Sequence, residues 1–159
     1  MSKVINWDQY FMGVAKLSAF RSKDPNTQVG ACIVSPENKI VGVGYNGLPW
    51  GCEDNDFPWD NREGGLYDTK YAYVVHAELN AILNSTQNLK GCRIYVSLFP
   101  CNECVKAIIQ SGITKIIYED DKYKGVPSDM AAKRMLSAAG VEYVKMPYFD
   151  IEINIFLYR

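Results

Sequence analysis

Histidine is nearly absent from this sequence, and the cysteines are odd in number. Among 159 residues there are one histidine and five cysteines. A metal site built from several histidines is therefore excluded, and a transition-metal site in this chain would need sulfur ligands. An odd cysteine count without regular spacing also argues against a disulfide framework. We therefore expect reduced thiols and a cytoplasmic location.

An excess of charge of one sign is also missing. Seventeen Lys and Arg residues against eighteen Asp and Glu residues give a net charge of -1. Such a chain has no basic field to attract a polyanion, so we expect no polynucleotide partner. The apolar runs are short, and the first ten residues, MSKVINWDQY, lack the basic and then apolar pattern of a signal peptide. We therefore expect no membrane association.

The composition that is present is that of a folded protein. Hydrophobic residues make up 48% of the sequence and charged residues 22%, which supplies enough apolar surface to offset the entropy of the chain. A length of 159 residues suits one hydrophobic core. We therefore predict a single domain over residues 1–159.

Hydrophobic periodicity predicts alternating helices and strands along the chain. Trp7, Phe11 and Val14 recur at helical spacing behind Asn6, a possible cap, and two β-branched runs on either side of a short turn predict a hairpin. Strands that alternate with helices favour parallel pairing through right-handed crossovers. The prediction is an α/β three-layer sandwich, with a five-stranded mixed sheet and helices on both faces. The predicted helices span 7–20, 76–84, 101–110 and 128–139, and the predicted strands span 29–35, 39–45, 93–97, 115–118 and 141–145.

Two segments do not follow this periodicity. Residues 46–70 are rich in proline, glycine and tryptophan and show neither helical nor strand spacing. A loop of this length in a small domain is usually functional, so we expect it to line or cover a site. The apolar segment 146–159 is expected to dock on the body of the protein or on a neighbouring subunit.

Two short motifs carry residues that bind metals. The first is His76-Ala77-Glu78, and the second, after a predicted strand, is Pro100-Cys101-Asn102-Glu103-Cys104. Both lie at predicted helix starts, and the two cysteines, three residues apart, share one face of a helical turn. With His76 they offer three ligands to one zinc ion and leave a fourth position open, as in catalytic rather than structural zinc sites.

This arrangement suits hydrolysis. Zinc lowers the pKa of a bound water to about 7, and Glu78 is placed beside the metal without being its ligand, so that it could carry the proton to the substrate. A C-x-x-C motif alone is equally compatible with a redox pair or with two buried thiols. H-x-E followed by P-C-x-x-C is the signature of zinc deaminases that act on cytosine and adenine rings.

Five stretches resemble one family. The chain resembles the deoxycytidylate (dCMP) deaminase branch of the cytidine-deaminase-like superfamily, which implies the cytidine deaminase fold and the conversion of dCMP and water to dUMP and ammonia. By this resemblance His76, Cys101 and Cys104 match the zinc ligands and Glu78 matches the proton shuttle. The stretches are DPNTQVGACIV (24–34), NKIVGVGYNGLPWGC (38–52), DTKYAYVVHAELNAI (68–82), YVSLFPCNECVKAIIQSG (95–112) and DKY (121–123).

The same resemblance implies further contacts with the substrate. Ala77 matches a position whose backbone reads the base, and Tyr123 matches a tyrosine that contacts the substrate; an ordinary half-buried loop aromatic is the alternative. A mononucleotide also needs donors for its phosphate, and Lys23, Asn26 and Thr27 are candidates. For Lys23 the alternative is a solvated surface charge.

The segment Gly44-Tyr45-Asn46-Gly47 has two candidate roles. Asn46 could donate to the sugar or phosphate, or it could serve only its own turn. In the resembling family this segment is associated with allosteric nucleotides, dCTP as activator and dTTP as inhibitor, acting on a hexamer with Mg²⁺ present. The resemblance therefore implies a homo-oligomer and nucleotide regulation.

Some members of this family hold a second, structural zinc through extra cysteines and a histidine. This chain has no histidine besides His76, so we expect one catalytic zinc per chain. Two other functions stay open at this stage: a deaminase of another cytosine nucleotide or nucleoside, and a non-catalytic zinc-binding protein.

Overall fold

A five-stranded sheet organises the chain in the computed structural model, which describes residues 4–60 and 63–157. The strands are β1 (Gly30–Val34), β2 (Ile40–Tyr45), β3 (Arg93–Leu98), β4 (Lys115–Asp120) and β5 (Glu142–Lys145), in the spatial order β2-β1-β3-β4-β5. The β1–β2 and β1–β3 pairs are antiparallel, whereas β3–β4 and β4–β5 are parallel. The predicted hairpin and mixed sheet are confirmed.

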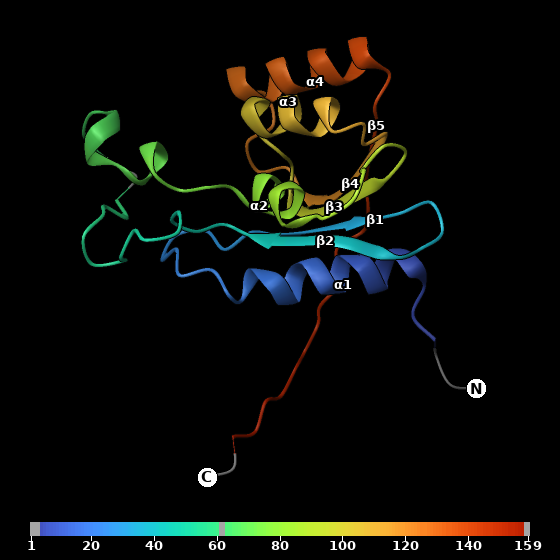
Figure 1. The fold of residues 1–159 in the computed structure, drawn as a ribbon, viewed down its shortest axis with the longest axis horizontal. Coiled ribbons are helices and arrows are strands. Elements are labelled where there is room, and N and C mark those ends of the chain that lie inside the picture. Colours follow the sequence, from blue (N-terminus) through green and yellow to red (C-terminus); the bar gives the residue numbers. More distant parts are fainter. Residues whose placement is uncertain (1–3, 61–62, 158–159) are drawn as a thin grey trace.

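Helices cover both faces of the sheet. Helix α1 (Trp7–Ala19) lies against one face, and α2 (Ala77–Asn84) and α3 (Asn102–Gln110) lie on the other, with α4 (Pro127–Ala139) packed on α3 and β5 (Figure 1). The predicted three-layer arrangement is therefore confirmed. None of these helices in the described part of the chain is long and apolar enough to cross a membrane.

Local signals explain where the helices begin and end. The Asn6 side chain accepts from the backbone N–H of Gln9 at 2.8 Å, and the Gln9 side chain accepts from the N–H of Asn6 at 3.0 Å, which forms a capping box before α1. Gly140 ends α4 in the left-handed conformation, with φ at 69°, which a glycine adopts without steric cost.

Alternation along the strands divides the core into two layers. In β1, Ala31 and Ile33 face the cluster under α2 and α3, whereas Cys32 and Val34 face the cluster under α1. The thiols of Cys32 and Cys92 are buried, as expected of small core side chains. Burial raises the pKa of Cys32 to about 12, so this thiol is inert at neutral pH.

The two irregular segments have different structures. The long loop contains two short 3₁₀ helices, η1 (Leu66–Asp68) and η2 (Lys70–Ala72), which the periodicity did not predict because each is only one turn long. In the C-terminal segment, Met146 and Phe149 pack on the cluster under α1. Ile151 also reaches α1, since a Cβ atom on Gly13 would stand 3.2 Å from its Cδ1 atom. Beyond it the chain runs away from the body (Figure 1), and Leu157 is 89% exposed. The docking prediction is thus met by the first part of this segment.

Helix α2 lies unusually close to β2, and glycines make this possible. A Cβ atom on Gly44 would stand 2.4 Å from the backbone oxygen of Ala77, and one on Gly42 would stand 2.5 Å from that of Ala81. Both distances are shorter than any real carbon contact, and backbone atoms of a helix cannot rotate away. Glycine at these two positions therefore sets the separation of α2 from the sheet.

We predict that Gly44→Ala lowers the free energy of unfolding by about 1–3 kcal/mol, because α2 must move to admit the methyl group. Urea unfolding measures this. Gly47→Ala is the matched control, since a Cβ atom there meets nothing within 4 Å. Equal stability of the two variants would contradict the role of this contact.

Candidate active site

Two helix starts meet on the same side of the sheet, and each contributes a residue that can bind a metal. His76 is the N-cap of α2 and Cys101 is the N-cap of α3, both with extended backbone. The helices therefore begin one residue later than predicted, at Ala77 and Asn102. An N-cap side chain is not part of the helical surface, and the positive end of the helix dipole next to it favours a thiolate.

His76, Cys101 and Cys104 form one cluster. The Nδ1 atom of His76 lies 3.4 Å from the Sγ atom of Cys101 and 3.4 Å from that of Cys104, and the three ligand atoms all lie within 4.8 Å of one another. Zinc bonds of about 2.0–2.3 Å in tetrahedral geometry place ligand atoms roughly 3.5 Å apart. One nitrogen and two sulfurs at this separation fit a zinc ion.

The cluster also favours ionised sulfur. A hydrogen bond from Cys104, assisted by one from His76, lowers the pKa of Cys101 to about 4 despite its burial. Donating this hydrogen bond to Cys101 raises the pKa of Cys104, and burial raises it further. The pair thus shares one proton, which a divalent cation would displace.

Glu78 lies in the first turn of α2 beside this cluster. It is 4% exposed, and it lines the same pocket as His76 and Cys101. Burial raises the pKa of Glu78 above its ordinary value, although the nearby His76 opposes the shift. A carboxyl with a raised pKa beside a metal site can accept a proton and return it near neutral pH.

A pocket of about 350 Å³ opens onto the cluster, a size within the range of small-molecule sites. His76, Glu78 and Cys101 line it. Its other walls come from the loop before β1, the end of β2, the long loop, and the segments after β3 and β4. The lining residues outside the cluster include Thr27, Asn46, Lys70, Tyr71, Phe99, Tyr123 and Lys124.

Four of the predicted substrate residues line this pocket. Ala77 is fully buried at the first position of α2, where a backbone N–H has no partner inside the helix. Tyr123 is half exposed at the rim, and the Thr27 hydroxyl accepts from Lys122 at 3.3 Å. Asn46 is the fourth.

Two other predicted phosphate donors do not line the pocket. Lys23 is exposed and forms an ion pair with Asp54, so its ammonium faces the outer surface of the long loop. The Asn26 amide donates to the backbone oxygen of Trp59 at 3.1 Å. Both side chains instead hold the long loop against the segment before β1.

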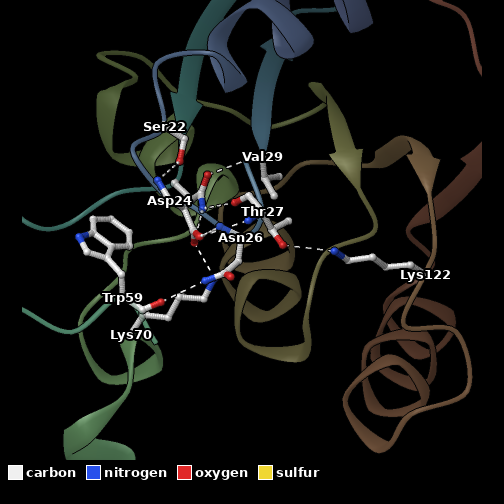
Figure 2. Close-up of polar contacts among 9 residues, drawn as sticks. Ser22, Asp24, Asn26, Thr27, Val29, Trp59, Lys70 and Lys122 are labelled. Atoms are coloured by element: carbon white, nitrogen blue, oxygen red, sulfur yellow. Dashed lines mark hydrogen bonds and ion pairs between the residues drawn. The ribbon is translucent and has the colours of Figure 1, made fainter. Parts of the chain in front are cut away.

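A polar network surrounds the buried Asp24 (Figure 2), and Asn46 takes part in it. Its amide nitrogen donates to the backbone oxygen of Thr27 at 2.9 Å and to Asp24 at 3.3 Å. Its amide oxygen accepts from the backbone N–H of Val29 at 2.9 Å. Both N–H groups of the amide are therefore used within the protein, as expected of a residue that shapes the pocket wall.

The rest of the 44–47 segment connects this wall with α2. Gly44 touches the backbone of α2, as described above, and the backbone oxygen of Tyr45 accepts from the side chain of Asn80 at 2.8 Å. Gly47 forms a bridge with Val75, next to His76. The segment predicted to bind effectors is thus joined to the helix that carries Glu78.

Asp24 and Lys70 were not among the predicted site residues. The Nζ atom of Lys70 lies 2.6 Å from Asp24, and the two side chains are 9% and 1% exposed. The residues are 46 positions apart, and no local spacing connects them. The one available signal was that both lie inside the stretches that carry the family resemblance.

Comparison with known proteins agrees with this geometry. The family described as "Cytidine and deoxycytidylate deaminase zinc-binding region" matches residues 5–120. Deoxycytidylate deaminase from Homo sapiens is 56% identical over 142 residues, which cover 89% of this chain and 80% of the human protein. The probable deoxycytidylate deaminase of Drosophila melanogaster is 55% identical over 145 residues, covering 87% of this chain and 71% of that protein.

A solved structure has the same fold. The dCMP deaminase from cyanophage S-TIM5, in complex with dCMP and dUMP, aligns with a TM-score of 0.68 at 27% identity and covers 87% of this chain and 95% of the phage chain. The predicted cytidine deaminase-like fold is confirmed. With the match over residues 5–120, these similarities show that the chain belongs to the cytidine and deoxycytidylate deaminase family.

Proposed function

We propose that this protein catalyses the hydrolytic deamination of dCMP to dUMP and ammonia, with one zinc ion held by His76, Cys101 and Cys104. The observation that carries the proposal is the buried Glu78 carboxyl next to this nitrogen and sulfur cluster, at the inner end of a nucleotide-sized pocket. Relatives that are 56% identical are deoxycytidylate deaminases, which supports the choice of substrate.

The bound zinc would supply Lewis acidity, which makes water a nucleophile at neutral pH. Glu78 takes one proton from the attacking water and delivers it to N3 of the ring. It then takes the second proton from the new C4 hydroxyl and gives it to the amino group, which leaves C4 as ammonia while the C4 carbonyl forms. The raised pKa of Glu78 suits both steps, because a higher pKa makes the carboxylate a stronger proton acceptor while the protonated carboxyl can still return the proton. The Ala77 N–H is positioned to donate to the base, and the Tyr123 ring borders the substrate at the rim.

A second part of the proposal concerns regulation by nucleotides and assembly into an oligomer. We infer that dCTP activates and dTTP inhibits a homo-hexamer through the 44–47 segment, with Mg²⁺ carried by the triphosphate. The support is mechanical: Asn46 holds the pocket wall, and Gly44 touches the helix that bears Glu78. A ligand that shifts the 44–47 segment would therefore shift both the pocket wall and helix α2.

The first test is the loss of ultraviolet absorbance with dCMP as substrate, with CMP, deoxycytidine and cytidine run in parallel. We expect dCMP to be the preferred substrate, with turnover raised by dCTP and lowered by dTTP in the presence of Mg²⁺. Preference for cytidine or deoxycytidine would instead favour a nucleoside deaminase. Zinc-loaded protein that turns over none of them would favour a non-catalytic role.

Glu78→Gln should lower kcat by about 10²–10⁴-fold, while zinc content and thermal stability stay unchanged. The amide has the shape of the carboxyl but cannot carry the proton. Glu103→Gln is the matched control, since Glu103 lies in the second motif but is exposed and pairs with Lys106. Full activity of Glu78→Gln would remove Glu78 from the mechanism.

Cys104→Ala should abolish or greatly weaken zinc binding, because one of three protein ligands is lost. Elemental analysis of the wild type should give one zinc per chain. Cys52→Ala, which changes a half-buried cysteine outside the cluster, should keep the wild-type content. Two tightly held zinc ions in the wild type, or unchanged zinc in Cys104→Ala, would contradict the assignment.

A further inference from the structure

A buried cation lies in the pocket wall and belongs to no part of the proton-transfer machinery. The Lys70 side chain is 9% exposed, lines the pocket, and follows directly after Thr69 in the long loop. Burying a lysine is costly unless its charge is paired. Asp24 supplies the pairing carboxylate at 2.6 Å.

Asp24 is held rigidly from four directions. Its Oδ1 atom accepts from the backbone N–H groups of Asn26 at 2.8 Å and Thr27 at 3.1 Å. Its Oδ2 atom accepts from Lys70 at 2.6 Å, a contact drawn in Figure 2. The same atom accepts from the Asn46 amide at 3.3 Å. A carboxylate offers about four acceptor sites, so Asp24 is saturated and cannot turn toward a ligand.

The Lys70 ammonium, unlike the Asp24 carboxylate, is not saturated with hydrogen bonds from the described residues. An ammonium group has three N–H donors, and the hydrogen bond to Asp24 is the one that the described residues give its Nζ atom. The two other donors belong to a side chain that lines the pocket. An anionic oxygen is the best acceptor for the donors of a buried ammonium, because charge-assisted hydrogen bonds are stronger than those between neutral groups.

The other charges of the described pocket wall are less suited to bind an anion. Asp121 pairs with Lys145 and Asp129 pairs with Lys133, so these carboxylates are neutralised by cations from outside the pocket lining. Lys124 also lines the pocket, but it is exposed, and solvent screens an exposed charge. Lys70 is therefore the best-placed cation for a phosphate that carries nearly two negative charges at neutral pH.

We propose that Lys70 binds the 5′-phosphate of the substrate and that Asp24 is a positioning residue that aims the Lys70 ammonium into the pocket. This inference rests on the proposed function and deepens it, because it names the group that separates a mononucleotide from a nucleoside. The saturated Asp24 holds the Lys70 ammonium in place before the substrate arrives, so little reorganisation is needed on binding.

The test compares dCMP with deoxycytidine in variants of this pair. Lys70→Met removes the ammonium and keeps the length of the side chain, but it leaves Asp24 buried without its cation, which can prevent folding. The double variant Asp24→Asn/Lys70→Met removes both charges together. Thermal melting and zinc content establish that each variant is folded before kinetics are measured.

We expect kcat/KM for dCMP to fall about 10- to 100-fold in these variants, the factor typical of one charge-assisted hydrogen bond, mainly through KM. Activity on deoxycytidine should change less than about threefold. Lys115→Met is the matched control, since Lys115 forms an exposed ion pair with Glu142 outside the pocket lining, and it should behave as the wild type. Equal losses on dCMP and deoxycytidine, or a loss on dCMP that follows Lys124→Met instead, would overturn the proposal.

A binding measurement separates this proposal from the proposed activity. Calorimetry with dUMP and deoxyuridine needs no turnover, so it reports on Lys70 even if dCMP proves not to be the substrate. We expect the wild type to bind dUMP at least about 10-fold more tightly than deoxyuridine and the double variant to lose this difference. Wild-type protein without that preference would refute the phosphate-binding role.

Discussion

The closeness of helix α2 to strand β2 fixes the geometry on which the rest of the site depends. Gly42 and Gly44 carry no Cβ atoms, so the α2 backbone rests directly on the strand. The hydrogen-bonded ladder from β2 through β1 to β3 then fixes where α2 stands relative to the segment after β3. His76 and Cys101 meet because the two helix starts are held in this relation.

Burial then gives each group in the site its chemical character. The pKa of Glu78 rises because its carboxyl is removed from water, whereas that of Cys101 falls because neighbouring donors stabilise its thiolate. Burial raises the pKa of both groups, and hydrogen-bonding partners decide the sign of the net shift. Asp24 and Lys70 are a separate case, in which two buried side chains of opposite charge form an ion pair. The pocket therefore has a proton-transferring end and a charged wall.

Much of the fold was predictable because its signals are local. The capping Asn6, the terminating Gly140 and the alternation in the strands all act over a few residues, and the elements they predicted are present. The metal cluster was also predictable, since His76 and the two cysteines lie in short motifs at helix starts. The one-residue shift in both starts follows from the N-cap role of His76 and Cys101.

The side chains that line the pocket wall were harder to predict from the sequence. Lys23 was a reasonable phosphate donor by its position in the loop, yet it faces outward and pairs with Asp54. Asn46 lies in the pocket, but its donors are used within the protein. Whether a polar side chain faces a ligand or a neighbour depends on contacts across dozens of residues, and neither composition nor spacing records them.

The amino-acid sequence was enough to predict the alternation of helices and strands, the donor set of one nitrogen and two sulfurs, and the carboxyl beside it. These depend on residue type and short-range spacing. The tertiary structure alone decided that Asp24 meets Lys70 and that glycines let α2 approach the sheet. Such contacts join residues far apart in the chain, and they arise only when the sheet and its two covering layers pack together.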